Sequence, residues 1–482
     1  MQTLSRNQIL TASVQSIARA IRTGALTPTG VLEVHITRMK EVNPKINGVF
    51  AERFDLAREE AALLDEEQRS GQVDFGSKPL FGVPCTIKEF IKVKGMPHTG
   101  GLVSCADNIA TEDAEVVQRI RRAGAVVMAT SNVPEGGMWM ETFNKIRGRT
   151  NNPWNLSRTA GGSSGGEAAL VSTGASPFGI GSDIAGSIRI PAGFCGTTGH
   201  KPSGRRVPNT GHWGGLSPTT NPFLVIGPLT RTVSDARLLL SILEGADGVD
   251  TDVLDWPSPA LPDLGSVRYA LVDSVSGIRS SAGMRAALLR GGKALSNRGA
   301  SEFSLPKSLL DKAKAVWSNA MSAASRDGKT FEMVLGRGSP ISIRKEAIKF
   351  MRRKSEFTLP ALGAVGFEKI MNRLPDPFLP KGPALSSLQE DLENELGENG
   401  VLLVPPYSRE APRHGAPLLT PLHFVFTGVF SVLEFPATQI PCALSGGLPT
   451  GIQVVGPRGA DSLCLRLGQV LEDSLGGWRR SM

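Results

Sequence analysis

Apolar residues in the first 70 positions recur at three- and four-residue intervals, as in "VLEVHITRMKEV" (31–42) and "DLAREEAALLDEEQ" (55–68). This spacing places the apolar side chains along one face of a helix and predicts a mainly helical stretch over residues 8–66. We therefore expect residues 1–70 to form a helical region that packs against a larger domain.

From residue 79 the pattern changes to short strands that alternate with helices. "PLFGVPCTIKEF" (79–90) is a β-prone run that ends at Lys88, and "AVVMATSN" (125–132) has the composition of a buried strand. Between them, the side chain of Thr111 is predicted to cap a helix through "EDAEVVQRIRRAG" (112–124).

Later segments continue this alternation. They are a small-residue helix and a strand within "GGEAALVSTGASPFGIGSDIAG" (165–186), helices at "SDARLLLSILEG" (234–245) and "SLCLRLGQVLEDSLGG" (462–477), and a strand at "LPTGIQVVGP" (448–457). The chain is therefore expected to form one α/β domain over residues 1–482, with a central mixed, twisted sheet and helices on both faces. Residues 306–395 look mostly helical and polar, which predicts a cap or insertion within this domain.

The charge pattern narrows the choice of partners. The formal net charge is +8, yet the cations are scattered, and only "KFMRRK" (349–354) is a dense basic run. This run fits either a solvated helix face or peripheral contact with an anionic membrane. No basic stripe is interleaved with aromatic residues, so we expect no nucleic-acid partner. The longest uncharged run, Gly415–Leu433, contains prolines, a histidine and threonines, and so predicts packed interior and no transmembrane segment.

Cysteine usage points to a reducing compartment. The five cysteines are widely spaced and lack a CxxC pair, which argues against a disulfide framework and against a zinc site: Cys85, Cys105, Cys195, Cys442 and Cys464. The N-terminal stretch carries charges throughout and has no apolar core of the signal-peptide type. We therefore expect a cytoplasmic protein without a bound metal.

Two glycine-rich segments carry the candidate chemistry, "GGSSGG" (161–166) and "SDIAGSIRIPAG" (182–193). A nucleotide-binding loop is disfavoured because "GIGSDI" (179–184) lacks the third glycine of the dinucleotide pattern, so no cofactor is expected. The GxSxG match at 161–165 suggests a hydrolase elbow served by a later histidine: His200, His212, His414 or His423. That elbow should follow a hydrophobic strand, whereas the preceding "NNPWNLSRTA" (151–160) is polar. A Ser-His-Asp hydrolase therefore stays open only as a secondary alternative, and His98, His200 and His212 look structural.

Lys88 offers a different base. Burial favours the neutral amine of a lysine, and a neutral amine can accept a proton. A lysine that does not reach the nucleophile directly can act through a second serine, which relays the proton. One lysine at a strand end and two glycine-flanked serines would then replace the histidine.

These residues resemble the signature of a known family. The quoted motifs are "TIKE" (86–89), "GGSSGGEAAL" (161–170) and "SDIAGSIRIPA" (182–192) with the following "GTTGHKPSGRRVP" (196–208). They are similar to the amidase signature family of serine hydrolases, and most similar to its type 2 fatty-acid amide hydrolases. The 24-residue separation of Ser163 and Ser187 also agrees with that family.

The resemblance implies a role for each motif residue. Ser187 would be the nucleophile, Ser163 the bridging serine after a cis peptide bond, and Lys88 the base. Backbone N–H groups would form the oxyanion hole at Ile184, Ala185, Gly186 and Ser187. Substrate would be bound at Gly136, Gly137 and Met138, and the site would be supported by Ser164, Asp183 and Arg189, the last two as a structural pair.

Two departures from the family pattern concern the oxyanion hole and the substrate. Ala185 stands where the family commonly has glycine, so either its dihedral angles suit alanine or the oxyanion hole is reshaped. We expect no membrane-anchoring helix of the kind typical of type 2 fatty-acid amide hydrolases, which argues against membrane-derived lipid substrates.

The expected activity is hydrolysis of small-molecule amides through an acyl-enzyme. Apolar acyl amides or anilides are favoured because Met138, Trp139, Met140 and "LHFVFTGVFSVLEF" (422–435) could line an apolar pocket. Esters and carbamates are also open as substrates. The alternative is a glutaminase subunit that passes ammonia to a partner enzyme. The resemblance leaves a homodimer open.

Overall fold

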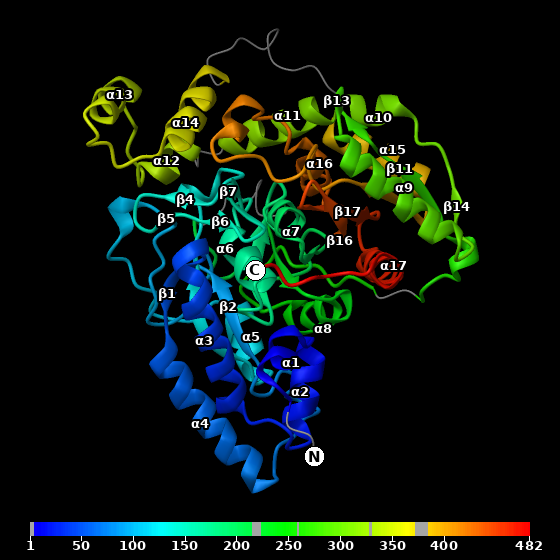
Figure 1. Cartoon of the computed structure of the whole chain (residues 1–482). Helices are drawn as coiled ribbons and strands as arrows, with labels where there is room; N and C mark the ends of the chain where they lie inside the picture. Colours follow the sequence, from blue (N-terminus) through cyan, green and yellow to red (C-terminus); the bar gives the residue numbers. More distant parts are fainter. Residues whose placement is uncertain (1–3, 215–222, 258–259, 327–329, 372–383) are drawn as a thin grey trace.

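An eleven-stranded sheet runs through the centre of the molecule (Figure 1). The computed structural model describes residues 4–214, 223–257, 260–326, 330–371 and 384–482. The strands are, from edge to edge, β1 (Val49–Glu52), β3 (Val126–Ser131), β2 (Pro84–Lys88), β8 (Gly179–Asp183), β10 (Val225–Thr230), β9 (Thr198–Lys201), β16 (Ala437–Ser445), β17 (Leu448–Val455), β15 (Gly400–Val404), β11 (Arg268–Leu271) and β14 (Ser301–Glu302). Strand β2 is parallel to β3 and β8, β11 is parallel to β14 and β15, and the remaining pairs are antiparallel. The predicted α/β class with a mixed sheet is confirmed.

Helices cover both faces of this sheet because successive strand side chains point to opposite sides. Val126 and Met128 of β3 pack in one apolar cluster, whereas Val127 packs in another. The first cluster contains α3 (Pro28–Ile46), α4 (Phe54–Ser70), α6 (Gly165–Ser172) and α7 (Arg189–Cys195). The second contains α1 (Arg6–Thr11), α2 (Val14–Arg22), α5 (Glu115–Arg122), α8 (Val233–Leu243), α9 (Ala282–Ser296) and α17 (Asp461–Leu475).

The N-terminal region is helical, as predicted, through α1 to α4, and β1 adds a strand that pairs with β3. The cap predicted at Thr111 is wrong. Helix α5 begins at Glu115, and its N-cap residue is Ala114. The residues before it are held by tertiary contacts instead: the Ala114 N–H donates to the Lys92 carbonyl, and the Asp113 carboxylate accepts from the Lys94 N–H. These contacts keep residues 112–114 out of the helix.

Residues 306–395 are mostly helical, as predicted, within the part that the structure describes, which omits 327–329 and 372–383. The helices fall into two groups (Figure 1). A third apolar cluster, which contains α16 (Val425–Val432), includes residues of α10 (Lys307–Asp311), α11 (Ala313–Arg326) and α15 (Leu385–Leu396). A separate small core around Leu102 and Cys105 includes residues of α12 (Phe331–Leu335) and α14 (Leu359–Met371), beside α13 (Ile343–Met351). That these helices form a cap or insertion within the domain stays a prediction.

The uncharged run Gly415–Leu433 forms a short 3-10 turn and α16, whose residues are all buried. The α16 part of the run is packed interior, as predicted, but the preceding turn is not, since Leu418 and Leu419 are 40% and 85% exposed. None of the helices in the described ranges combines the length and apolar character needed to cross a membrane. All five cysteines are free and buried.

Candidate active site

Lys88 is the last residue of β2, which lies between β3 and β8 in the sheet. Its ammonium nitrogen Nζ lies 2.6 Å from Ser163 Oγ, 3.0 Å from Ser182 Oγ and 3.3 Å from the Ser182 carbonyl oxygen. Strands β2 and β8 are parallel neighbours, so their carboxyl ends bring Lys88 and Ser182 to the same edge of the sheet. The first predicted contact of the site, Lys88 to Ser163, is therefore present in the structure.

Burial makes Lys88 a candidate base. The side chain is fully buried, and loss of solvation lowers its pKa from 10.5 to about 7, although Asp183, Glu167 and Glu89 oppose this shift. The same burial raises the pKa of Glu89 and of Glu167 to about 8. Both carboxyls are then largely neutral near pH 7, which weakens their hold on the Lys88 proton. A substantial share of Lys88 is therefore the neutral amine at neutral pH.

Ser163 stands just before α6, after a cis peptide bond between Gly162 and Ser163, as the resemblance implied. Its side chain is only 3% exposed. The next residue, Ser164, connects this turn to the second glycine-rich segment: its N–H donates to the Ser187 carbonyl (3.1 Å), and its hydroxyl donates to the Ser182 carbonyl (3.3 Å). Ser164 thus holds the two segments together.

Ser187 lies in the turn between β8 and α7 and is 9% exposed. Of the four N–H groups expected to form the oxyanion hole, the one of Gly186 donates to Asp183 Oδ1 at 2.6 Å. In this arrangement it is not free to bind a substrate oxygen, which corrects the expectation for Gly186. The N–H groups of Ile184, Ala185 and Ser187 have no hydrogen-bond partner within the described part of the chain.

Gly186 is required for its conformation. Its φ of +122° is a region that favours glycine, and a Cβ atom there would lie 2.1 Å from Thr427 Oγ1. The Thr427 hydroxyl donates to the Ala185 carbonyl at 2.8 Å, which fixes the peptide between residues 185 and 186. Ala185 itself is not among the residues with positive φ, so alanine is accommodated without backbone strain.

Asp183 and Arg189 form a fully buried ion pair with an N–O distance of 3.0 Å. Burial by itself would raise the pKa of Asp183, but the Arg189 guanidinium holds it well below its usual range. Arg189 also donates to Gln453 on β17 and to Ser431 on α16. The pair ties the turn that carries Ser187 to the centre of the sheet, as expected for a structural role.

Three of the four histidines named for the elbow alternative are engaged elsewhere, and the fourth, His212, contacts Ser182. His200 is hydrogen-bonded to Thr438 and Asp461, His414 to the Leu156 carbonyl, and His423 to Ser408. Among the described residues, no histidine is hydrogen-bonded to Ser163 or Ser187. The geometry therefore favours Lys88 as the group that acts on Ser163.

A family model described as Amidase matches residues 30–465. The chain belongs to the amidase signature family. It is 36% identical to fatty-acid amide hydrolase 2-A of Danio rerio over 98% of this chain and 90% of that protein. It is 29% identical to a glutamyl-tRNA(Gln) amidotransferase subunit of Geobacillus stearothermophilus over 96% of this chain and 97% of that one. A solved structure of 6-aminohexanoate cyclic dimer hydrolase with substrate superposes with a TM-score of 0.77, 26% identity, and coverage of 98% and 99%. The protein is an amide-hydrolysing enzyme.

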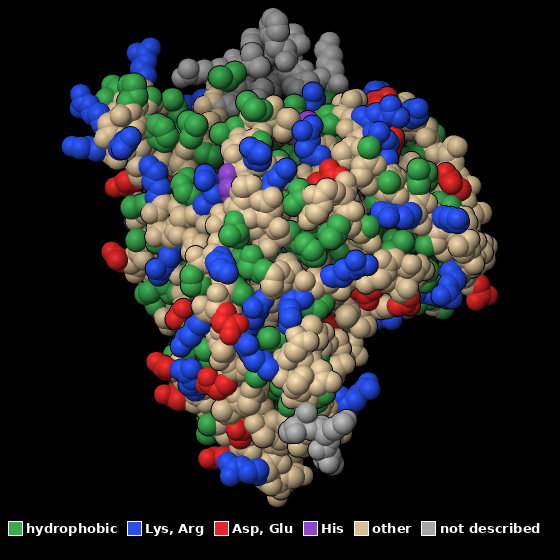
Figure 2. All heavy atoms as spheres, viewed as in Figure 1, with side chains coloured by type: hydrophobic (Ala, Val, Ile, Leu, Met, Phe, Trp, Pro, Cys, Tyr) green, Lys and Arg blue, Asp and Glu red, His purple; other side chains and the backbone are tan. Residues whose placement is uncertain are grey.

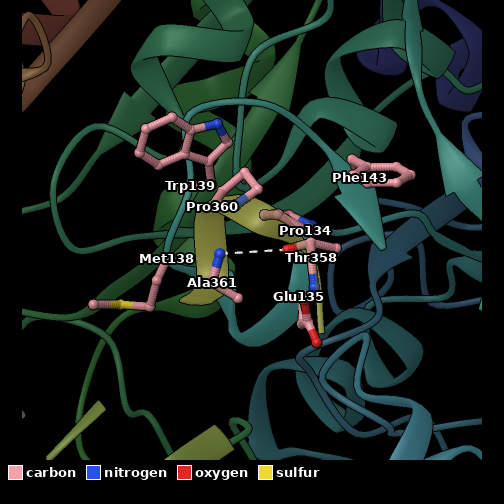
Figure 3. A pocket seen from close by; sticks show the side chains of 8 residues that line it. All are labelled: Pro134, Glu135, Met138, Trp139, Phe143, Thr358, Pro360 and Ala361. Atoms are coloured by element: carbon pink, nitrogen blue, oxygen red, sulfur yellow. Dashed lines mark hydrogen bonds between the residues drawn. The ribbon is translucent and has the colours of Figure 1, made fainter. Parts of the chain in front are cut away.

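In this amidase, Met138, one of the three expected substrate-binding residues, lines the pocket shown in Figure 3. Figure 3 shows the pocket between the segment that follows β3 and the start of α14, lined by Pro134, Glu135, Met138, Trp139, Phe143, Thr358, Pro360 and Ala361. The pocket lies beside the site, because a Cβ at Gly162 would lie only 2.5 Å from the Trp139 carbonyl oxygen. Gly136 and Gly137 are not in the lining: a Cβ atom on them would meet Leu335 and Phe90, respectively.

The other apolar residues expected at a pocket belong mainly to the core of the amidase. Met140 is buried in a cluster with Ile190, Phe194 and Tyr407, which Trp139 and Phe424 join from the side. Within the 422–435 segment, the residues of α16 pack in the third apolar cluster. That this segment could line a substrate pocket stays a prediction.

Four residues near Lys88 were missed or given another role by the sequence reasoning. Glu89 is adjacent to it in the chain, Glu167 is close enough to affect its pKa, and Ser182 contacts it directly. His212 contacts Ser182 (2.9 Å) although it was expected to be structural. Glu89, Glu167 and Ser182 lie within motifs quoted above, at 86–89, 161–170 and 182–192, although the sequence reasoning gave them no role. His212 lies outside these motifs.

Proposed function

We propose that this amidase cleaves linear carboxylic amides with an apolar acyl group, through Ser187, Ser163 and Lys88. The observation that carries the proposal is the 2.6 Å contact between the Ser163 hydroxyl and the buried Lys88 amine, whose pKa burial lowers to about 7. The remaining steps follow from where each proton must go during acylation and deacylation.

In the proposed reaction the Lys88 lone pair takes the Ser163 hydroxyl proton while Ser163 takes that of Ser187. Ser187 Oγ attacks the carbonyl carbon, and the N–H groups of Ile184, Ala185 and Ser187 are aimed at the charge on the oxygen. The relay then runs in reverse: Ser163 protonates the departing amine and is reprotonated by Lys88. A water molecule cleaves the ester on Ser187, so that amide and water become carboxylic acid and amine.

An apolar acyl group is supported by the character of the side chains beside the site, which line a pocket that is small in this structure. Most of its lining side chains are apolar, including Met138 and Trp139, and Met138 is 45% exposed. The 36%-identical relative is named fatty-acid amide hydrolase 2-A, and fatty-acid amides are amides with an apolar acyl group. The glutaminase alternative rests on the less similar amidotransferase relative and needs a site for a small polar substrate.

We expect a panel of primary amides to show turnover that increases with acyl-chain length. Purified protein is assayed for release of the amine or ammonia from acetamide, hexanoamide, oleamide and glutamine. Long-chain amides should exceed acetamide in kcat/KM by on the order of 10²-fold, because each buried methylene contributes about 0.8 kcal/mol. Similar values for acetamide and oleamide would contradict the apolar assignment, and preferred hydrolysis of glutamine would support the glutaminase alternative.

A basic and apolar surface near the pocket supports peripheral membrane contact. Helix α13 exposes Ile348 (47%), Phe350 (39%) and Met351 (76%). Six exposed basic residues accompany them: Arg344, Lys345, Lys349, Arg352, Arg353 and Lys354. Figure 2 shows Lys and Arg side chains projecting around hydrophobic ones at the corner where α13 lies. We propose that this surface, the α13 corner, docks on an anionic lipid surface and brings apolar substrate to the pocket.

The protein is expected to sediment with vesicles of phosphatidylserine and phosphatidylcholine, and much less with phosphatidylcholine alone. Replacing Met351 and Phe350 together by aspartate should weaken this binding about tenfold or more, since it removes apolar contact and adds negative charge. The matched control is Leu63→Asp, because Leu63 is 65% exposed on α4, well away in sequence from the α13 corner. Equal sedimentation of the double variant and wild type would refute the assignment of this surface.

A further inference from the structure

A chain of hydrogen bonds continues from Lys88 beyond the three proposed catalytic residues. Lys88 Nζ contacts Ser182 Oγ (3.0 Å), and Ser182 Oγ contacts His212 Nε2 (2.9 Å). The other ring nitrogen, His212 Nδ1, lies 2.9 Å from the Trp213 carbonyl oxygen. The chain therefore ends at a backbone group that can only accept a hydrogen bond.

The fold places His212 here through backbone pairing with the residues that follow Lys88. Ile91 and His212 form an antiparallel bridge, the Trp213 N–H donates to the Phe90 carbonyl (2.7 Å), and the Lys92 N–H donates to the Gly211 carbonyl (3.1 Å). The imidazole ring also packs edge-on against Phe90. His212 is thus held in register with the end of β2 by the main chain.

The hydrogen-bond donors and acceptors around Lys88 determine how the Ser182 hydroxyl must be oriented. A neutral amine has two N–H groups and one lone pair, and the nitrogen has three close partners. The Ser182 carbonyl can only accept, so it takes one N–H. The lone pair is available to Ser163 only if the Ser182 hydroxyl takes the second N–H. If Ser182 donated its own hydrogen to Lys88, that hydrogen would occupy the lone pair that Ser163 needs.

His212 decides which way the Ser182 hydroxyl points. Since the Trp213 carbonyl accepts, His212 Nδ1 carries the hydrogen, and Nε2 of the neutral ring is an acceptor. Burial, together with the nearby Lys88, lowers the pKa of His212 to about 3, so the ring is neutral at working pH. The Ser182 hydrogen is then donated to His212, and its oxygen lone pairs face Lys88.

We propose that His212 is a positioning residue: its neutral ring orients the Ser182 hydroxyl and so keeps the Lys88 lone pair free for the proton of Ser163. The inference rests on the proposed function and deepens it, because it concerns the same base. It requires an acceptor at the position of Nε2, whereas a structural role would require only the shape of the ring.

Three variants separate the acceptor from the shape. His212→Phe keeps an aromatic ring and removes the acceptor. His212→Gln places an amide oxygen near the position of Nε2, and His212→Asn, its shorter counterpart, reaches only as far as Nδ1. We expect kcat for a preferred amide to fall roughly tenfold in the Phe and Asn variants, the scale of one hydrogen bond, with little change in KM, and to be largely restored in the Gln variant. Equal activities of the Gln and Asn variants would overturn the proposal.

A double-mutant cycle with Ser182→Ala provides a second test that does not need the Phe variant to be stable. If His212 acts only through the Ser182 hydroxyl, its replacement by Asn should change kcat by less than about twofold once that hydroxyl is gone. A full tenfold loss in the Ser182→Ala background would overturn the proposal. The rate of Ser187 modification by a fluorophosphonate is measured alongside. A wild-type protein without amidase activity would refute the proposed function, whereas an active wild type with unaffected variants refutes only the role of His212.

Discussion

Replacing Ser187 by alanine is expected to abolish both amide hydrolysis and labelling by an alkyl fluorophosphonate. The hydroxyl is the only group in the proposed reaction that forms a bond to the acyl carbon, so its loss should reduce kcat by about 10⁴-fold or more. Wild-type protein should gain the mass of one phosphonyl group, and peptide mapping should place it on Ser187. Intact-mass spectrometry after incubation with the probe measures both.

Two controls make this result specific. Ser157→Ala removes an exposed serine outside the site and should label like wild type. The melting temperature of Ser187→Ala should stay close to that of wild type. Within the described part of the chain the Ser187 side chain has no hydrogen bond, and the hydrogen bond from Ser164 goes to the Ser187 backbone carbonyl, which the substitution keeps. An adduct on Ser163 in the wild type would move the nucleophile to the GxSxG segment and contradict the assignment of Ser187.

Replacing Lys88 by methionine, which keeps most of the side-chain volume, is expected to lower kcat for amides by about 10²–10⁴-fold, the contribution of a positioned general base. The pH dependence gives a sharper test. Only the neutral amine is active, and burial sets the pKa of Lys88 at about 7. In wild type, kcat/KM should therefore fall about tenfold per pH unit below 7 and level off above it. This fall, the acidic limb of the pH profile, should be missing from the residual activity of Lys88→Met.

Lys201 offers a matched control for this limb. It is a second fully buried lysine whose pKa burial lowers to about 7, but its Nζ donates to the carbonyl groups of Pro202 and Phe435. Lys201 has no hydroxyl to deprotonate. The variant Lys201→Met should therefore keep the fall in kcat/KM at the same pH, even if the substitution lowers stability. Glu89 and Glu167 also titrate near this range, and Gln at either position should at most displace the limb. A limb that disappears in Lys201→Met and persists in Lys88→Met would contradict the assignment of the base.

The sequence predicted the principal residues of the site better than their contacts. Lys88 at a strand end and two serines among glycines were recognisable because strand pattern and glycine clustering are local properties. Gly186 illustrates the limit: the sequence shows a residue suited to an unusual backbone conformation, but not that its N–H is taken by Asp183. Thr111 shows the same limit for a helix cap, since the residues after it are held by the segment at Lys92 and Lys94.

Hydrophobic periodicity and residue type act over short stretches of chain, so the sequence alone predicted most helices and strands and the candidate residues for proton transfer. Which of these groups meet depends on the packing of distant segments. Lys88 and Ser163 are 75 positions apart, and their contact depends on how β2 and β8 align in the sheet. His212 joined the site through backbone pairing with residues 90–92, a contact that no local pattern encodes. Each donor and acceptor has few partners, and the packing of distant segments determines which one it takes.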